Sequence, residues 1–134
     1  MNIKHFFEVY SPKRLWRKIW LGLTCLPMLP QHRAKLLKLG GVNIKGRAYI
    51  YSGVSVDTVY PDCIHIGNNV AITAGTRILT HYLDPSKKGR IFRKGEVHIE
   101  DDVFIGLNVL ICNSVTFGKG SFVDYTNVVI RSIL

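Results

Sequence analysis

The sequence predicts an all-β solenoid in which short strands form the three flat sides of a stacked, triangular coil. The main observation is a strict repeat of six residues that runs from Ile99 to Leu134. This period does not suit a helix, whose apolar face recurs every three or four residues, and it is longer than plain strand alternation. Three repeats are expected to complete one coil, and coils to stack at about the 4.8 Å strand spacing. The first position of the repeat is always large and apolar: Ile99, Ile105, Ile111, Phe117, Val123 and Val129.

The positions between these apolar residues support the same architecture. Gly, Asn and Asp favour tight turns, and they recur at the second to fourth positions of the repeat. Each repeat is therefore predicted to combine one short strand with one corner of the coil. The turn-forming residues are Asp101, Asp102, Gly106, Asn108, Asn113, Gly118, Gly120 and Asp124.

The composition indicates one packed domain. The chain has 134 residues, of which 47% are apolar, so we expect a core rather than disorder. Cys25, Cys63 and Cys112 lack a CxxC spacing, which favours reduced thiols in a cytoplasmic protein. The five histidines are scattered along the sequence, so we expect no metal cofactor.

The net charge of +9 is concentrated in two segments. Residues 1–47 hold ten Lys and Arg against Glu8, and residues 77–94 hold six against Asp84. Two local basic surfaces are therefore expected. Nucleic acid is not expected as a partner, because no aromatic stacking platform accompanies a basic groove.

Residues 11–30 predict an amphipathic helix that begins with Ser11 as its cap and Pro12 at its first position. The apolar run 19–30 is too short to cross a bilayer, and no small-x-small cleavage site follows it, so we do not expect export. A short second helix, ended by Gly40 and Gly41, is expected to follow. One side of the first helix carries Leu15, Trp16, Ile19, Trp20 and Leu23, and the other carries Lys13, Arg14, Arg17 and Lys18.

Two interpretations of this helix remain open. Residues 1–41 could form a helical cap that buries the tryptophan side against the open end of the solenoid. Alternatively, residues 12–30 could contact an anionic membrane surface, where basic residues beside Trp and Leu are favoured. The second interpretation would place a cytoplasmic protein at the inner face of the membrane.

The β-helix itself is expected to occupy residues 42–134. A first coil is marked by Ile44, Ile50 and Val56, and a second by Ile66, Ile72 and Ile78. Residues 61–64 break the register, and a polar excursion of residues 84–98 precedes Ile99. A loop of that length in a compact domain is often functional. The repeats stop in mid-pattern at the last residue, so we expect an open edge, covered by another molecule or poorly ordered.

Across Ile66–Val123, the order of repeats, basic loop and repeats resembles the hexapeptide-repeat acyltransferases, which include maltose and galactoside O-acetyltransferases. The resemblance implies a left-handed parallel β-helix, acetyl-CoA as the donor, and a homotrimer with sites between subunits. It also implies a general-base histidine in the segment Thr80-His81-Tyr-Leu-Asp84-Pro85. From its position alone, His81 is better explained as a surface histidine at a strand end, and it is the resemblance that favours the catalytic role. Neutral imidazole can accept a hydroxyl proton near pH 7.

The same resemblance assigns the remaining candidate site residues. Asp84 and Arg90, with the other loop bases, are expected to bind an acceptor, although a merely solvated loop is the simpler alternative. Tyr125 and Asp124 stand where small residues leave room for the pantetheine arm, so Tyr125 could narrow that channel. The expected donor-binding residues are Phe104, Gly106, Leu107, Tyr125 and Arg131.

The sequence thus leads to one main functional hypothesis and two alternatives. The main one is an acetyl-CoA-dependent O-acetyltransferase that acts directly on a sugar hydroxyl, in surface polysaccharide assembly, with His81 as general base. The first alternative is a truncated, non-catalytic β-helix that serves as a scaffold or oligomer partner. The second is an N-acyltransferase for an amino sugar or amino acid.

Overall fold

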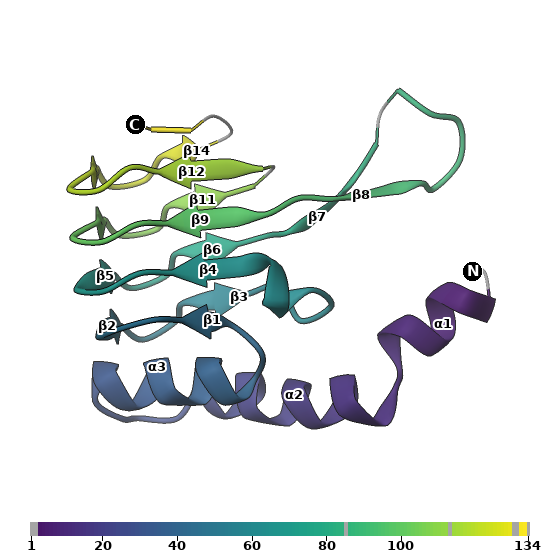
Figure 1. Cartoon of the computed structure of the whole chain (residues 1–134), viewed down its shortest axis with the longest axis horizontal. Coiled ribbons are helices and arrows are strands. Elements are labelled where there is room, and N and C mark those ends of the chain that lie inside the picture. The colour runs from purple at the N-terminus through teal and green to yellow at the C-terminus, as the bar shows by residue number, and fades with distance from the viewer. Residues whose placement is uncertain (1–2, 85, 113, 130–131, 134) are drawn as a thin grey trace.

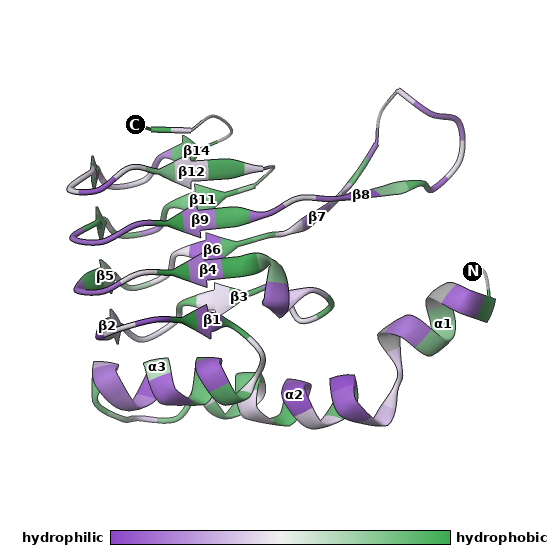
Figure 2. Ribbon diagram, viewed as in Figure 1, coloured by the Kyte–Doolittle hydropathy of each residue, from purple (hydrophilic) through white to green (hydrophobic). Residues whose placement is uncertain are grey.

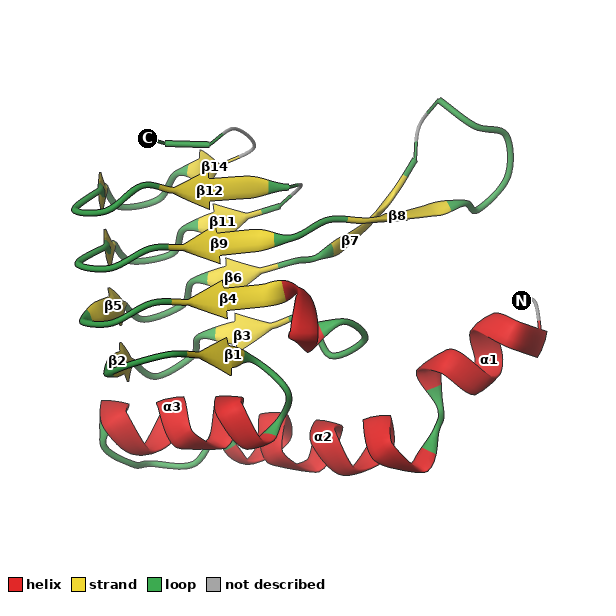
Figure 3. Cartoon of the chain, in the orientation of Figure 1, coloured by secondary structure: helices red, strands yellow, loops and turns green. Residues whose placement is uncertain are grey.

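The computed structural model describes residues 3–84, 86–112, 114–129 and 132–133, which form helices followed by a stacked coil (Figures 1 and 3). Three four-stranded sheets make the sides of the coil. Every pairing between their strands is parallel. The chain visits each sheet once per coil and then rises by one level, so the predicted left-handed parallel β-helix is confirmed.

The strands are short, as a repeat of six residues requires. The first sheet contains β1 (Asn43–Ile44), β4 (Ile64–Ile66), β9 (Val97–Ile99) and β12 (Val115–Phe117). The second contains β2 (Ala48–Ile50), β5 (Val70–Ile72), β10 (Phe104–Ile105) and β13 (Phe122–Val123). The third contains β3 (Ser55–Val56), β6 (Arg77–Ile78), β11 (Leu110–Ile111) and β14 (Val128–Val129).

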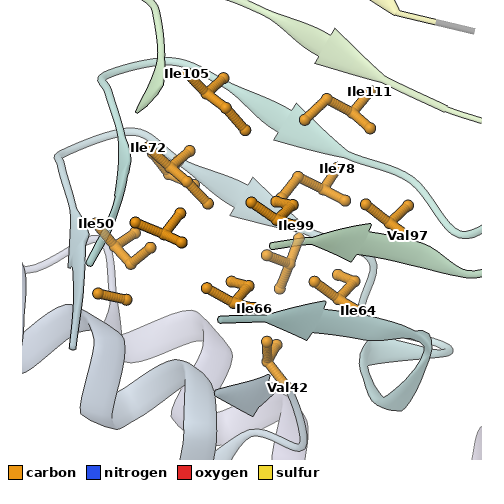
Figure 4. Close-up of a cluster of buried hydrophobic side chains, with 14 of the residues drawn as sticks. Val42, Ile50, Ile64, Ile66, Ile72, Ile78, Val97, Ile99, Ile105 and Ile111 are labelled. Atoms are coloured by element: carbon orange, nitrogen blue, oxygen red, sulfur yellow. The ribbon is translucent and has the colours of Figure 1, made fainter. Parts of the chain in front are cut away.

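The first positions of the repeat form the core of the coil (Figure 4). Each buried isoleucine contributes about 1.5–3 kcal/mol relative to an exposed one, so a column of them supplies most of the cohesion between coils. The predicted core is therefore confirmed. Its members with at most 2% exposure include Ile50, Ile66, Ile72, Ile78, Ile99, Ile105, Ile111 and Phe117.

Polar turn residues stack above one another at the corners. The Asn68 side-chain oxygen accepts a hydrogen bond from Arg47 N–H at 3.0 Å, and Asp101 accepts one from Asn68 N–H at 2.8 Å. Asp102 and Asn108 adopt left-handed backbone angles, with φ of 57° and 53°. Asn and Asp tolerate this conformation better than other side chains do, which explains their choice at these corners.

Three helices precede the coil: α1 (Ile3–Val9), α2 (Pro12–Leu23) and α3 (Pro30–Leu39). Helix α2 begins as predicted, with the Ser11 hydroxyl accepting a hydrogen bond from Arg14 N–H at 3.4 Å. Helix α3 lies beneath the first coil (Figure 1), where Ala34 and Leu37 are buried. None of the described helices has the length and apolar character that crossing a bilayer requires.

Burial of the tryptophan side of α2, the first of the two interpretations, is wrong for Trp16 and Ile19, while Trp20 is half-buried. Trp16 is 58% exposed and Ile19 is 56% exposed, whereas the buried residue of α2 is Leu21. Hydrophilic and hydrophobic stretches alternate along the ribbon of this helix (Figure 2). The physical reason is that α3 occupies the position beneath the coil, so α2 can turn only its Leu21 side inward. Leu21 packs closely against Gly40, where an added Cβ would lie 2.4 Å from the leucine Cδ2.

Two excursions interrupt the coil at the same corner. Residues 57–63 follow β3 and end in a short 3₁₀ helix, η1 (Pro61–Cys63), and the second excursion separates β6 from β9. The second was expected as a loop over residues 84–98, and this is corrected by the structure. It is an antiparallel hairpin of β7 (His81–Leu83) and β8 (Phe92–Lys94), because residues 81–83 pair with residues 92–94 instead of continuing the coil.

Candidate functional site

The candidate site lies at the corner where the third sheet meets the first, because both excursions leave the coil there. Val56 pairs with Ile78 in the next coil. Asp57, the next residue, therefore lies one level below the segment between Ile78 and His81. Thr80 strengthens this junction by donating its hydroxyl to the Tyr60 carbonyl oxygen at 3.0 Å. The register of the coil therefore brings the two excursions into contact.

The Asp57 carboxylate is the centre of this junction and is only 2% exposed. Its Oδ2 atom accepts hydrogen bonds from the backbone N–H of Thr80 at 3.0 Å and of His81 at 3.1 Å, and it also contacts Nδ1 of His81. Its Oδ1 atom accepts hydrogen bonds from Val59 N–H at 2.8 Å and Tyr60 N–H at 3.2 Å. Five donors thus converge on one buried carboxylate.

These donors keep Asp57 ionised. Burial raises the pKa of Asp57, but the hydrogen bonds from Val59, His81, Thr80 and Tyr60 outweigh it and leave the pKa below its ordinary value of 3.8. An ionised carboxylate has no proton to donate. Asp57 can therefore only accept from His81.

This constraint fixes the protonation of the His81 ring. Nδ1 must carry a proton to donate to Asp57, so Nε2 of the neutral imidazole keeps its lone pair. The ring is half-buried, and it lies at a centroid distance of 5.9 Å from Tyr60 and 5.6 Å from Phe92. A histidine with this tautomer, a fixed orientation and a free Nε2 is suited to remove a proton from a bound hydroxyl.

The hairpin also brings positive charge to this corner. Lys94 is paired with His81 in the hairpin register, and its Nζ lies 4.6 Å from the centroid of the Tyr60 ring. Lys87, Lys88 and Arg90 are exposed in the connection between β7 and β8. An anionic ligand that approaches His81 therefore meets Lys94, while the other three bases lie at the far end of the hairpin.

Asp84 is placed inside the hairpin. It is 2% exposed, and its carboxylate accepts hydrogen bonds from Ser86 N–H at 3.0 Å, Ser86 Oγ–H at 2.6 Å and Arg93 Nε–H at 2.8 Å. The bonds from Ser86 and Arg93 hold the pKa of Asp84 below its ordinary value. Both oxygens serve the hairpin, and a contact between Asp84 or Arg90 and an acceptor stays a prediction.

The predicted donor-binding residues gather at a different corner, between the second and third sheets. The Phe104 ring stacks on that of Phe122, with centroids 5.1 Å apart. The Tyr125 side chain lies directly over Gly106, where an added Cβ would meet the tyrosine Cδ1 at 2.7 Å. Leu107 is 44% exposed beside them and Tyr125 is 53% exposed.

The predicted site residues therefore form two groups in the chain. His81 and Asp84 lie where the third sheet meets the first, and Gly106, Leu107 and Tyr125 lie where the second meets the third. The two corners are different edges of the triangular coil. Arg131 lies outside the described residues.

Sequence reasoning missed Asp57, although a signal was present. Asp57 follows Val56, the first position of the third repeat, and His81 stands three residues after Ile78, the equivalent position one coil later. Aligning these two repeats places Asp57 opposite Leu79, two residues before the histidine. The signal was obscured because both repeats are interrupted by excursions of different length.

Comparison with known proteins confirms the fold and the resemblance. No family model matches the chain. A galactoside O-acetyltransferase from Lactococcus lactis subsp. lactis (strain IL1403) is 30% identical over 98 residues, which cover 70% of this chain and 47% of that protein. The chain thus spans about half the length of the curated relatives that it matches.

Solved structures with the same fold cover nearly all of the chain. A hexapeptide-repeat-containing acetyltransferase from Vibrio cholerae matches with a TM-score of 0.73 and 20% identity over 98% of this chain and 84% of that chain. The same Vibrio protein has also been solved in complex with acetyl-CoA. A maltose O-acetyltransferase from Clostridium difficile 630 matches with a TM-score of 0.67 and 20% identity over 91% of this chain and 78% of that chain.

Proposed function

We propose that this protein transfers the acetyl group of acetyl-CoA to a hydroxyl group of a sugar, with His81 as the general base. The observation that carries the proposal is the contact between His81 Nδ1 and the buried, ionised Asp57, which leaves Nε2 free to accept a proton. The nature of the relatives supports the donor and the acceptor class, since they include galactoside and maltose O-acetyltransferases.

The proposed reaction is a direct transfer. Nε2 of His81 removes the proton of the acceptor hydroxyl, and the hydroxyl oxygen attacks the carbonyl carbon of the thioester. The carbon–sulfur bond of the thioester then breaks. His81 Nε2 passes the proton that it took from the acceptor to the departing CoA sulfur. Asp57 stabilises the positive charge that the imidazole carries between these steps, as the acid does in other acid–histidine pairs. Asp57 acts as a positioning residue, because it reaches the substrate only through His81.

The test is the rate of acetyl transfer to galactosides and maltose by the wild-type protein and the His81→Ala variant. A general base contributes about 10² to 10⁴-fold to the rate, so kcat of the variant is expected to fall by about 10²-fold or more. Activity within about threefold of wild type would overturn the role of His81. Wild-type protein that binds no acetyl-CoA would favour a scaffold, and transfer only to amino sugars would favour N-acylation.

We also propose that the active unit is a homotrimer. Two groups of predicted site residues at separate edges of one coil can form a single site only if a neighbouring chain supplies the second group. Sedimentation tests the assembly, and mixing two inactive variants tests the shared site. His81→Ala and Leu107→Glu proteins, unfolded and refolded together, are expected to regain about a quarter of the wild-type activity, because random assembly leaves that share of interfaces intact. No recovery from mixed trimers would contradict a shared site.

We further propose that α1 and α2 hold the protein against an anionic membrane, where lipid-linked glycans for surface polysaccharides would be within reach as acceptors. Phe7, Trp16 and Ile19 are 67%, 58% and 56% exposed, and Lys13 is exposed beside them. An interfacial helix combines these features. The wild-type protein is expected to co-sediment with vesicles that contain acidic lipid, and a Trp16→Glu, Ile19→Glu variant is not. Failure of the wild type to bind acidic vesicles would refute membrane contact without affecting the proposed chemistry.

A further inference from the structure

Two histidines that are far apart in the sequence lie side by side on the outer face of the first sheet. His65 is the middle residue of β4 and His98 the middle residue of β9, and the parallel register places them opposite each other. Their neighbours in both strands point into the core, so both rings point outward. The rings are stacked, with centroids 4.5 Å apart and planes inclined by 7°.

Glu96 joins this pair from the residues that lead into β9. Its Oε2 lies 3.3 Å from Nε2 of His98, and its Oε1 lies 3.7 Å from Nε2 of His65. One ligand atom from each of the three side chains lies within 4.8 Å of the other two. Nε2 of His65 is shielded from solvent and has no hydrogen-bond partner among the described residues. Two imidazoles and one carboxylate thus lie close together, with the two rings parallel and one imidazole nitrogen unsatisfied.

We propose that His65, Glu96 and His98 form a binding site for a divalent transition-metal ion, and that zinc is the ion it suits best. Two histidines and one glutamate are an established set of protein ligands for zinc, with water at the fourth position. Zinc–nitrogen bonds of about 2.0–2.1 Å bring tetrahedral ligand atoms to roughly 3.3 Å from one another. At least one ring must turn out of the parallel stack so that both nitrogen lone pairs point at the ion, and the 46% and 60% exposure of the His98 and Glu96 side chains leaves room for this movement.

Asn43 in β1 controls the orientation of the first histidine. Its Nδ2 lies 3.4 Å from Nδ1 of His65 and donates a hydrogen bond to the Asp62 carbonyl oxygen at 2.9 Å. Coordination through Nε2 leaves the ring proton on Nδ1, so the Asn43 amide must rotate and exchange its hydrogen bond to the Asp62 carbonyl oxygen for one that its own oxygen accepts from the ring. An aspartate at position 43 would accept that proton directly, and such outer partners strengthen metal binding.

The site is separate from the proposed reaction, because its ligands lie on the face of the first sheet and His81 lies at its edge. A bound ion would connect β4 to β9, which are neighbours in the first sheet and belong to the coils before and after the hairpin excursion. An ion that binds only the folded protein raises its stability. The expected role is therefore to hold together the coils on either side of the insertion.

The test is a calorimetric titration of metal-free protein with Zn²⁺, with thermal unfolding measured alongside. Thiolates also bind zinc, so Cys25 and Cys112 are first replaced by serine in every variant. The wild-type site is expected to bind about one ion per chain with a micromolar dissociation constant and to raise Tm. His98→Ala and Glu96→Gln are expected to weaken binding by about tenfold or more, and Asn43→Asp to tighten it. His32→Ala, which removes an exposed histidine of α3, is the matched control and should bind as wild type does.

Two outcomes would overturn the proposal. One is wild-type protein that neither binds Zn²⁺ nor gains thermal stability from it. The other is binding that His98→Ala and Glu96→Gln leave unchanged, which would assign the ion to other groups. If His98→Ala fails to fold, Glu96→Gln decides the question, because Glu96 is exposed and lies outside the strand. Circular dichroism of each metal-free variant checks its fold.

Discussion

Replacing Asp57 with asparagine tests the central contact of the candidate site. The carboxylate accepts two backbone N–H groups on Oδ1, and on Oδ2 it accepts two more together with the His81 ring. An amide of the same shape has one oxygen and one NH₂ group, so only one side can still accept. In either orientation, two backbone N–H groups face an NH₂ group. In one of them, that NH₂ group also donates to Nδ1 of His81 and moves the ring proton to Nε2.

The size of both effects follows from these hydrogen bonds. A buried donor left without a partner costs about 1–3 kcal/mol, so two of them lower the free energy of unfolding by about 2–6 kcal/mol. Loss of the acid, through a reversed tautomer or an unstabilised imidazolium, is expected to lower kcat by about 10² to 10⁴-fold. Stability and activity should therefore fall together in Asp57→Asn.

The assay follows release of the CoA thiol from acetyl-CoA with a galactoside acceptor, at a temperature where the variant remains folded. Asp102→Asn is the matched control, because it makes the same chemical change at an exposed corner with φ of 57°, which asparagine tolerates. The control should retain wild-type activity and stability. Asp57→Asn with kcat within about threefold of wild type would refute the reasoning that Asp57 sets the state of His81.

The lowered pKa of Asp57 predicts a further signature in acid. A carboxyl whose pKa is depressed on folding contributes stability that is fully present above its unfolded pKa, near 3.8, and is lost as pH falls through the folded value. Between about pH 5 and pH 3, Tm of the wild type should therefore fall more steeply than Tm of Asp57→Asn. If Tm of the two proteins falls equally with pH, the pKa of Asp57 is not lowered by folding, and the prediction is refuted.

Three other predictions concern the rest of the chain. Tyr125→Ala, which uncovers Gly106, should tighten acetyl-CoA binding several-fold if the tyrosine ring narrows the donor channel, and calorimetry would show no change if it does not. Ile105→Ala in the core should lower the free energy of unfolding in urea by about 2–5 kcal/mol, and a loss below about 1 kcal/mol would contradict close packing there. Asp84→Asn, which weakens the pairing with Arg93, should speed trypsin cleavage in the hairpin, and unchanged cleavage would show that Asp84 does not order it.

Much of the fold could be predicted because its main determinant is local and periodic. Whether Ile78 or Ile111 is buried depends on its place in the repeat, and both have no exposed surface. The start of α2 was predictable for the same reason, since the Ser11 cap and Pro12 act on neighbouring residues. These features require no knowledge of how distant segments pack.

The remaining features depend on packing between segments that the repeat does not relate. The tryptophan side of α2 is exposed because α3 covers the coil, and no pattern within α2 reveals which helix takes that position. The segment after Ile78 continues the repeat in sequence, yet His81 leaves the coil to pair with Lys94. His65 and His98 become neighbours only because the hairpin between them is excluded from the coil register.

The same register explains why the candidate site is built from two excursions. A coil with regular corners has no room for extra residues except outside the prism, so an insertion must leave at a corner and return to the next strand. Because β3 pairs with β6, the insertion after β3 and the insertion after β6 begin one strand spacing apart. A side chain of the first insertion can therefore contact a side chain of the second. Asp57 does this for His81, at the point where the two insertions leave the coil. Lengthening either insertion at its distant end should therefore leave the Asp57–His81 contact intact, whereas shifting the register by one residue at Val56 or Ile78 should destroy it.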